Sequence, residues 1–226
     1  MKKLTTWMNL QKINIFTYIM GFFVLGFSVN LLKASTLGTG AWDTVYINAY
    51  TLFHHVKGIS WITMGMLSFV MALTIMVIVL LYRRKWKYLM MLVPVFGVAI
   101  FIDFWNLLIF HDRVAEQLGF QILFFGIGLL ILPLGLTLFV KSTFTAYVFD
   151  ELMLMFVKIT KAKKITYVRL VIEFIGISTG LLIGYFSNYL YDQTFGAVNI
   201  GSLILTFTIS PVMAYYYRLL RIKTGQ

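Results

Sequence analysis

The sequence predicts an all-α transmembrane protein: a six-span helical bundle of two inverted three-span repeats, each with a re-entrant break and a short half-helix. Three observations lead to this class. The 226 residues are 60% hydrophobic and only 12% charged, whereas about 25% of residues are charged in a soluble domain. Lysine and arginine gather in alternate connections between apolar runs. A polar motif in the first half recurs in the second half.

Six apolar runs are long enough to cross a bilayer. A helix rises about 1.5 Å per residue, so roughly 20 apolar residues span a hydrocarbon core of about 30 Å. The runs cover about residues 13–32, 59–82, 88–110, 118–140, 165–190 and 197–217. Two shorter apolar stretches, 44–56 and 151–157, fit half-helices or re-entrant segments. We therefore expect residues 1–226 to form a single membrane domain whose first run is an uncleaved span.

The positions of the basic residues predict the orientation. All lysines and arginines except Lys33, Lys57 and Arg113 lie before the first run, between the second and third, around the link from the fourth to the fifth, or at the C-terminal end. Cytoplasmic connections carry an excess of such residues. Six crossings with cytoplasmic N- and C-termini place all these clusters on one side. Eight crossings would put the cluster at residues 83–87 outside.

An internal repeat is predicted from one spacing. The pattern Ser35-Thr36-(six residues)-Asp43 is echoed by Ser142-Thr143-(six residues)-Asp150. The repeats would cover about residues 13–110 and 118–218, and three crossings in each half would invert the second half. The first break then lies toward the outside and the second toward the cytoplasm. Many secondary transporters are built in this way, with broken helices meeting near the midplane.

The breaks supply most of the candidate site. The stretch Leu37–Asp43 is too rich in glycine to continue a helix, because an interior glycine costs about 1 kcal/mol relative to alanine. We expect Asp43 and Asp150 to cap the half-helices. If those helix starts lie inside the protein, their N–H groups could also face a small ligand or ion. The residues predicted to line a substrate or ion pathway are Gly38, Thr39, Gly40, Trp42, Asp43, Asp103, Asn106, Thr143, Asp150 and Glu173.

Two acids lie within predicted spans. A carboxylate there costs about 2.5–3.5 kcal/mol on insertion scales. Asp103, with Asn106 three residues later on the same face, either couples protons or cations, or is hydrated near the interface or bonded to a neighbouring helix. Glu173 lies four residues after Arg169. It forms either an intrahelical ion pair with an arginine that reaches the cytoplasmic interface, or a second proton site.

Several of these motifs resemble a known family. Gly21-(x)4-Gly26 followed by Leu37–Asp43, then Gly97–Asp103 and Asn199–Pro211, resemble motifs of the YczE/YyaS/YitT family of bacterial membrane proteins. Ala41 replaces the proline usual before tryptophan, and 145–147 lack the usual glycines. The resemblance implies a multi-pass protein of the bacterial cytoplasmic membrane. It brings no established substrate and no catalytic residue.

The sequence also disfavours several function classes. With no cysteine and three histidines, it offers no thiolate site and no metal-binding spacing, so we expect no metal and no cofactor. We expect no enzyme, because the apolar spans carry no Ser/His/Asp cluster and no P-loop occurs. The net charge of +11 is explained by topology signals, so nucleic acid is not an expected partner. The expected partners are the lipid bilayer and a small solute or ion; a homo-oligomer or a membrane partner stays open.

Two functions remain. The first is a small transporter or channel coupled to protons or cations, in which the paired breaks and the intramembrane acids form the pathway. The alternative is a non-transporting accessory or regulatory membrane protein, for which the acids would be dispensable and an exposed helix face would not.

Overall fold

The computed structural model describes residues 2–142, 144, 147–162, 165–189, 196–220 and 222. All regular elements in these ranges are helical. The eight α-helices are α1 Lys2–Ser35, α2 Asp43–Tyr50, α3 Met64–Arg83, α4 Leu92–Trp105, α5 Leu118–Ser142, α6 Val148–Thr160, α7 Ile165–Tyr189 and α8 Ile200–Leu219. Three short helical turns extend them: η1 Thr51–Val56, η2 Trp86–Met91 and η3 Asn106–Phe110.

Six of these helical segments are long and apolar enough to cross a membrane. They cover residues 14–35, 64–83, 86–110, 118–142, 165–187 and 200–219, which confirms the six predicted spans. The second starts later than predicted, because Thr63 caps α3: its hydroxyl accepts a hydrogen bond from the Met66 N–H at 3.1 Å. The two short apolar stretches form the shorter helices α2 with η1, and α6.

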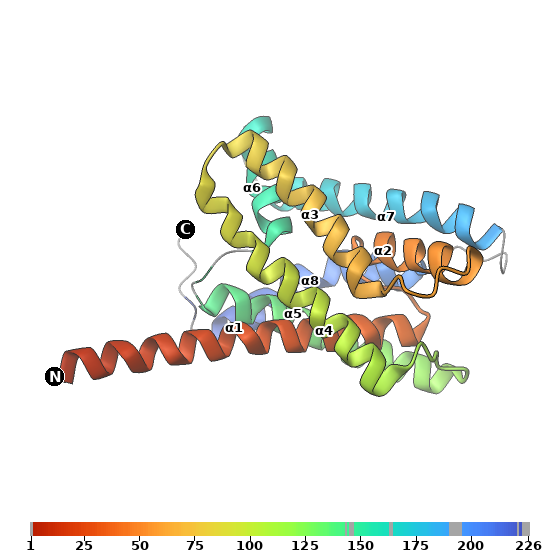
Figure 1. The fold of residues 1–226 in the computed structure, drawn as a ribbon, viewed down its shortest axis with the longest axis horizontal. Coiled ribbons are helices and arrows are strands. Elements are labelled where there is room, and N and C mark those ends of the chain that lie inside the picture. Colours follow the sequence, from red (N-terminus) through yellow and green to blue (C-terminus); the bar gives the residue numbers. More distant parts are fainter. Residues whose placement is uncertain are drawn as a thin grey trace.

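Helices α1 and α5 pack along each other, with α1 along the lower edge of the view in Figure 1. Helix α4 packs against α1, and α8 packs against α5. The close approach of α1 and α4 depends on Gly26, where an added Cβ would lie 2.5 Å from the Phe101 carbonyl carbon. The Asn30 side-chain amide crosses the same contact and donates to the Ile102 carbonyl oxygen at 2.9 Å.

The shorter helices α2 and α6 each pack against a long helix. Helix α2 lies beside α7, and α6 lies beside α3. Two glycines of α7 permit the first contact, because a Cβ on Gly176 would meet the Ala41 backbone at 3.2 Å and one on Gly180 would collide with the Thr44 hydroxyl. The turn between α3 and α4 lies at the same end of the bundle as the start of α1 and the end of α8 (Figure 1).

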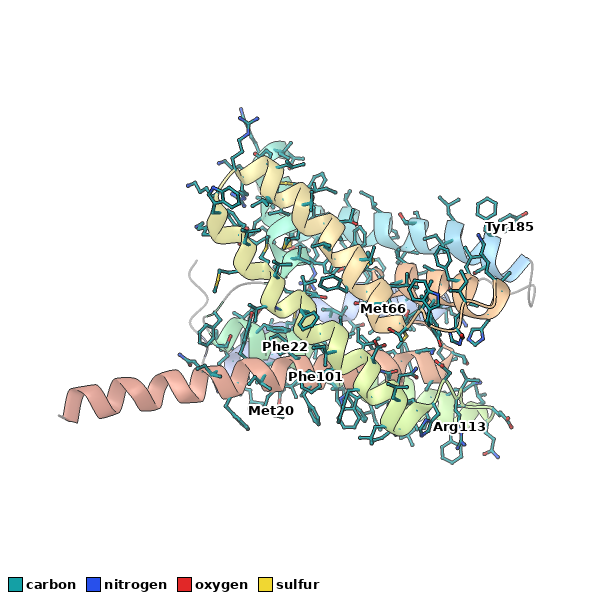
Figure 2. The ribbon with its side chains drawn as sticks, in the orientation of Figure 1. Met20, Phe22, Met66, Phe101, Arg113 and Tyr185 are labelled. Atoms are coloured by element: carbon teal, nitrogen blue, oxygen red, sulfur yellow. The ribbon has the colours of Figure 1, made fainter. Side chains whose placement is uncertain are left out.

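Large apolar side chains cover the outside of the bundle. Tyr185, for example, points away from it near the end of α7 (Figure 2). The exposed fractions of Val70, Leu107 and Leu182 are 55%, 69% and 63%. A soluble monomer rarely exposes continuous apolar surface on this scale, whereas lipid tails cover it readily. The structure is therefore that of a polytopic membrane protein.

Candidate functional site

A cavity of about 110 Å³ lies at the centre of the bundle. Every α-helix contributes at least one side chain to its wall. The apolar part comes from Leu25, Val29, Ala41, Val98, Leu132, Leu136, Met153, Ile172 and Ile209, and the glycine, polar and aromatic part from Gly40, Trp42, Asp43, Tyr46, Ser68, Tyr147, Phe149, Asp150, Arg169 and Glu173. Residues that follow the first break (40–43) and the second break (147–150) thus line the same cavity.

The first break is held in place by the start of α8. The backbone turns sharply after Ser35, with positive φ at Thr36 (59°) and Gly38 (129°). The Thr39 N–H donates to the Ser202 hydroxyl at 3.2 Å, and the Gly201 N–H donates to the Leu37 carbonyl at 2.8 Å. Gly38 and Thr39 therefore anchor the break against α8 and do not line the cavity.

Asp43 occupies a different position from the one predicted. It is the first residue of α2, while Trp42 holds the capping position without a side-chain hydrogen bond. The Asp43 carboxylate accepts a hydrogen bond from the Tyr46 hydroxyl at 2.9 Å, and its other oxygen lies against Gly40. Because the tyrosine one turn later binds the carboxylate, Asp43 faces the cavity instead of capping its own helix.

Asp150 is likewise not a capping residue. Helix α6 begins at Val148 with Tyr147 in the capping position, which places Asp150 in the first turn, near the positive end of the helix dipole. Within the described ranges its carboxylate accepts no hydrogen bond. Its favourable electrostatic neighbour there is Arg169 of α7.

The basic group of the cavity is the Arg169 guanidinium. Its Nε lies 3.9 Å from the Glu173 carboxylate, which confirms the predicted i, i+4 ion pair. Two further guanidinium nitrogens each lie 3.9 Å from the Met213 sulfur of α8. Glu173 also interacts electrostatically with Asp43 and Asp150. Three carboxyl groups and one guanidinium thus line the same cavity.

Comparison with known proteins identifies the family. A family model described as "Family of unknown function (DUF6198)" matches residues 12–218. The chain belongs to this family. It is 27% identical over 139 residues to the uncharacterized membrane protein YczE of Bacillus subtilis (strain 168), covering 61% of this chain and 60% of YczE, and so less than two thirds of that relative. It is 24% identical over 144 residues to the uncharacterized protein YyaS of the same organism, covering 64% and 68%. No solved structure matches.

These matches confirm the resemblance of this DUF6198 protein to YczE and YyaS, while the resemblance to YitT stays a prediction. Five of the predicted pathway residues line the central cavity: Gly40, Trp42, Asp43, Asp150 and Glu173. Thr143 lies outside the described residues.

Asp103 and Asn106 lie elsewhere in the DUF6198 fold. The Asp103 carboxylate accepts hydrogen bonds from the Gly65 N–H at 2.7 Å and the Thr63 hydroxyl at 2.6 Å. It therefore fastens the start of α3 to α4, as the bonded alternative predicted. The Asn106 amide donates to Asp112 at 3.1 Å and accepts from the Asp112 N–H at 3.2 Å.

Sequence reasoning missed a second polar cluster around Asp112. Its carboxylate accepts hydrogen bonds from Lys33, from the Tyr50 hydroxyl at 2.8 Å and from Asn106. Burial alone would raise the pKa of Asp112, but the Lys33 charge and these hydrogen bonds hold it below its ordinary value. One signal was available, because Lys33 is among the few basic residues outside the topology clusters.

Sequence reasoning also did not place Arg169, Tyr46 and Tyr147 in the cavity wall. No local pattern marks the tyrosines. The spacing of Arg169 and Glu173 marked an ion pair, but not that it faces inward, because that depends on the packing of α7 against α2.

Proposed function

We propose that this DUF6198 protein is a small secondary transporter or channel, and that the central cavity is its site for a cation or proton. The observation that carries the proposal is that Asp43, Asp150 and Glu173 line one cavity together with the guanidinium of Arg169. Ionisable groups at membrane depth are expensive, and they commonly mark ion or substrate pathways. A helical bundle with a purely structural role would not require three carboxyl groups in one cavity.

Two inverted halves, α1–α4 and α5–α8, are the second part of the proposal. The helix contacts that support it come in matching pairs. Helix α1 packs on α4 as α5 packs on α8, and α2 packs on α7 as α6 packs on α3. Exchanging the two halves converts each contact into its partner, as a two-fold axis between the halves requires.

The hydrogen bonds at the breaks match as well. The Ser35 hydroxyl donates to the Leu32 carbonyl at 2.6 Å and accepts from the Leu37 N–H at 3.3 Å. The Ser142 hydroxyl repeats both bonds at the equivalent residues Phe139 and Phe144, at 2.7 and 3.5 Å. Each serine thus ends its helix in the same way, which supports a common origin for the two breaks.

The equivalent aromatic residues Trp42 and Phe149 meet at the middle of the molecule. Their ring centroids are 5.2 Å apart, and both line the cavity. A residue that contacts its own repeat equivalent lies close to a two-fold axis. The cavity would therefore lie on that axis, where substrate sites of inverted-repeat transporters lie.

The basic residues orient this arrangement in a bacterial cytoplasmic membrane. With both termini and the α3–α4 turn in the cytoplasm, the first break opens toward the outside and the second toward the cytoplasm. Alternate opening of the two sides would expose the same acids first to one compartment and then to the other. A cation bound between Asp43 and Asp150 would compete with protons for the carboxylates, which couples the two fluxes.

The test compares acids inside and outside the cavity. Protein reconstituted in liposomes with a trapped pH dye reports proton flux under an imposed cation gradient. Asp150→Asn and Glu173→Gln should each lower the flux at least 10-fold. Asp103→Asn should retain it, because Asp103 does not line the cavity. Equal flux with and without protein would contradict transport and would favour an accessory role.

A further inference from the structure

We infer that the cavity binds a small organic cation whose charge is carried by an alkylated ammonium group. The inference rests on the proposed function, because it names the substrate class of the same site. Three features of the cavity lead to it: its charge, its aromatic residues and the apolar remainder of its wall.

The charge of the wall favours a cation. Among the described lining residues, Arg169 is the basic one, and its nearest acid is Glu173 at 3.9 Å. The Asp43 carboxylate accepts a hydrogen bond from the neutral Tyr46 hydroxyl. The Asp150 carboxylate accepts no hydrogen bond from the described part of the chain. With the acids ionised, negative charge exceeds positive charge in this space, and a bound cation would restore the balance. An anion would be repelled.

The aromatic residues are grouped beside the same acids. The Phe149 ring lies 5.2 Å from Trp42 and 5.4 Å from Tyr147. Tyr147 interacts electrostatically with both Asp43 and Asp150, so its hydroxyl lies near both carboxylates. The negative face of an aromatic ring attracts a cation, and groups of such rings recognise quaternary ammonium ions.

The rest of the wall distinguishes an organic cation from a metal ion. Hard cations need about six or more oxygen ligands around one point, and no group of three metal-binding side chains occurs in the described chain. Leucine, valine and isoleucine side chains from five helices make up most of the remaining wall. Such a surface suits N-methyl groups, which need no hydrogen-bond acceptor, better than a metal ion or a primary amine.

Choline and its uncharged isostere 3,3-dimethyl-1-butanol provide the test. The full-length protein in nanodiscs is titrated with each compound, and binding is followed by the shift in melting temperature and by calorimetry. Choline should bind saturably. The isostere and sodium chloride should bind at least 10-fold more weakly, because one lacks the charge and the other lacks the methyl groups. Equal binding of choline and the isostere would overturn the inference.

Variants assign the binding to this cavity. Asp150→Asn and Phe149→Leu should each weaken choline binding at least 10-fold, and Asp103→Asn should leave it unchanged. Two separate cavity variants keep the test valid if one of them does not fold. Unchanged choline affinity in both cavity variants would place the binding elsewhere and overturn the inference.

The inference can fail separately from the proposed function. If choline does not bind but Glu173→Gln still abolishes the proton flux, the ligand class is wrong and the transporter proposal stands. If choline binds with the expected variant pattern while no flux is measured, the inference stands and transport is wrong.

Discussion

The shape of the first break depends on Gly38. Its φ of 129° is rarely adopted by other residues, and an added Cβ would collide with the Ser202 backbone nitrogen at the start of α8. Neither the backbone nor the neighbour can move without disturbing the contact between the break and α8. The requirement for glycine here is therefore steric as well as conformational.

Gly38→Ala should lower the free energy of unfolding by about 3 kcal/mol, because a left-handed backbone costs an L-residue about 1–2 kcal/mol and the forced overlap adds about 1–3. Gly58→Ala is the matched control. Gly58 also has positive φ (67°), but nothing lies within 4 Å of its added Cβ, so about 1–2 kcal/mol is expected. Thermal unfolding in detergent measures both, and equal losses would contradict the packing argument.

The lowered pKa of Asp112 predicts that the stability of the protein depends on pH. Its folded pKa lies below the ordinary value of 3.8, because Lys33 and the hydrogen bonds outweigh the effect of burial. The ionised group therefore stabilises the fold fully above that ordinary value, and this contribution is lost as the pH falls through the lowered folded pKa. Tyr50 and Asn106 hold the same carboxylate, so the effect should be local to this cluster.

The measurement compares melting temperatures of the unmodified protein and Asp112→Asn between pH 3 and pH 8. The difference between the two proteins should be constant from about pH 6 to 8 and should shrink below about pH 4. A difference that stays constant or grows toward pH 3 would show that the carboxylate is not held in its ionised form.

At the scale of elements, the start of α3 depends on the hydrogen bond between Thr63 and Asp103, called the tie below. The Thr63 hydroxyl caps α3 through the Met66 N–H and also donates to Asp103 of α4. One side chain thus fixes where α3 begins and joins it to the next helix. The apolar sequence 59–62 alone predicts an earlier start, because periodicity does not reveal which threonine finds a carboxylate across the helix pair.

Thr63→Ala removes both bonds and should cost about 1–3 kcal/mol of stability. Thr74→Ala on the same helix is the control, because the exposed Thr74 hydroxyl bonds only within its own helix, to Val70. That variant should change the stability by no more than about 0.5 kcal/mol. Denaturant unfolding in mild detergent compares the two variants. Similar small losses in both would show that the tie to Asp103 is weak.

The short helices α2 and α6 show how far local sequence predicts an element. Their existence followed from apolar stretches too short to span, and the structure confirms helices at both places. The capping roles expected of Asp43 and Asp150 were wrong. Capping preference is a local tendency. A hydroxyl one turn away, or an arginine on another helix, outweighs it once the chain is packed.

At the scale of the whole molecule, the number of spans was predictable and the site was predictable only in part. Span length and apolarity are properties of each segment alone, so all six spans could be read before folding. The meeting of Asp43, Asp150 and Glu173 depends on glycines that let α7 approach α2. Asp103 was equally conspicuous in sequence, yet it binds the start of α3, because an intramembrane acid shows its need for a partner but not which partner it meets.

The central claim is that the two breaks reach one cavity from opposite faces of the membrane. Because the chain has no cysteine, single cysteines can be introduced at the equivalent positions Leu37 and Phe144 without further changes. Gly58 and Lys85, in the connections before and after α3, serve as reference positions for the two faces.

The decisive measurement is labelling of these variants in intact cells with a membrane-impermeant maleimide. Leu37→Cys should react from outside together with Gly58→Cys. Phe144→Cys should react only after the membrane is opened, together with Lys85→Cys. Reaction of Leu37→Cys and Phe144→Cys from the same face would contradict the inverted arrangement and, with it, a cavity reached alternately from two sides.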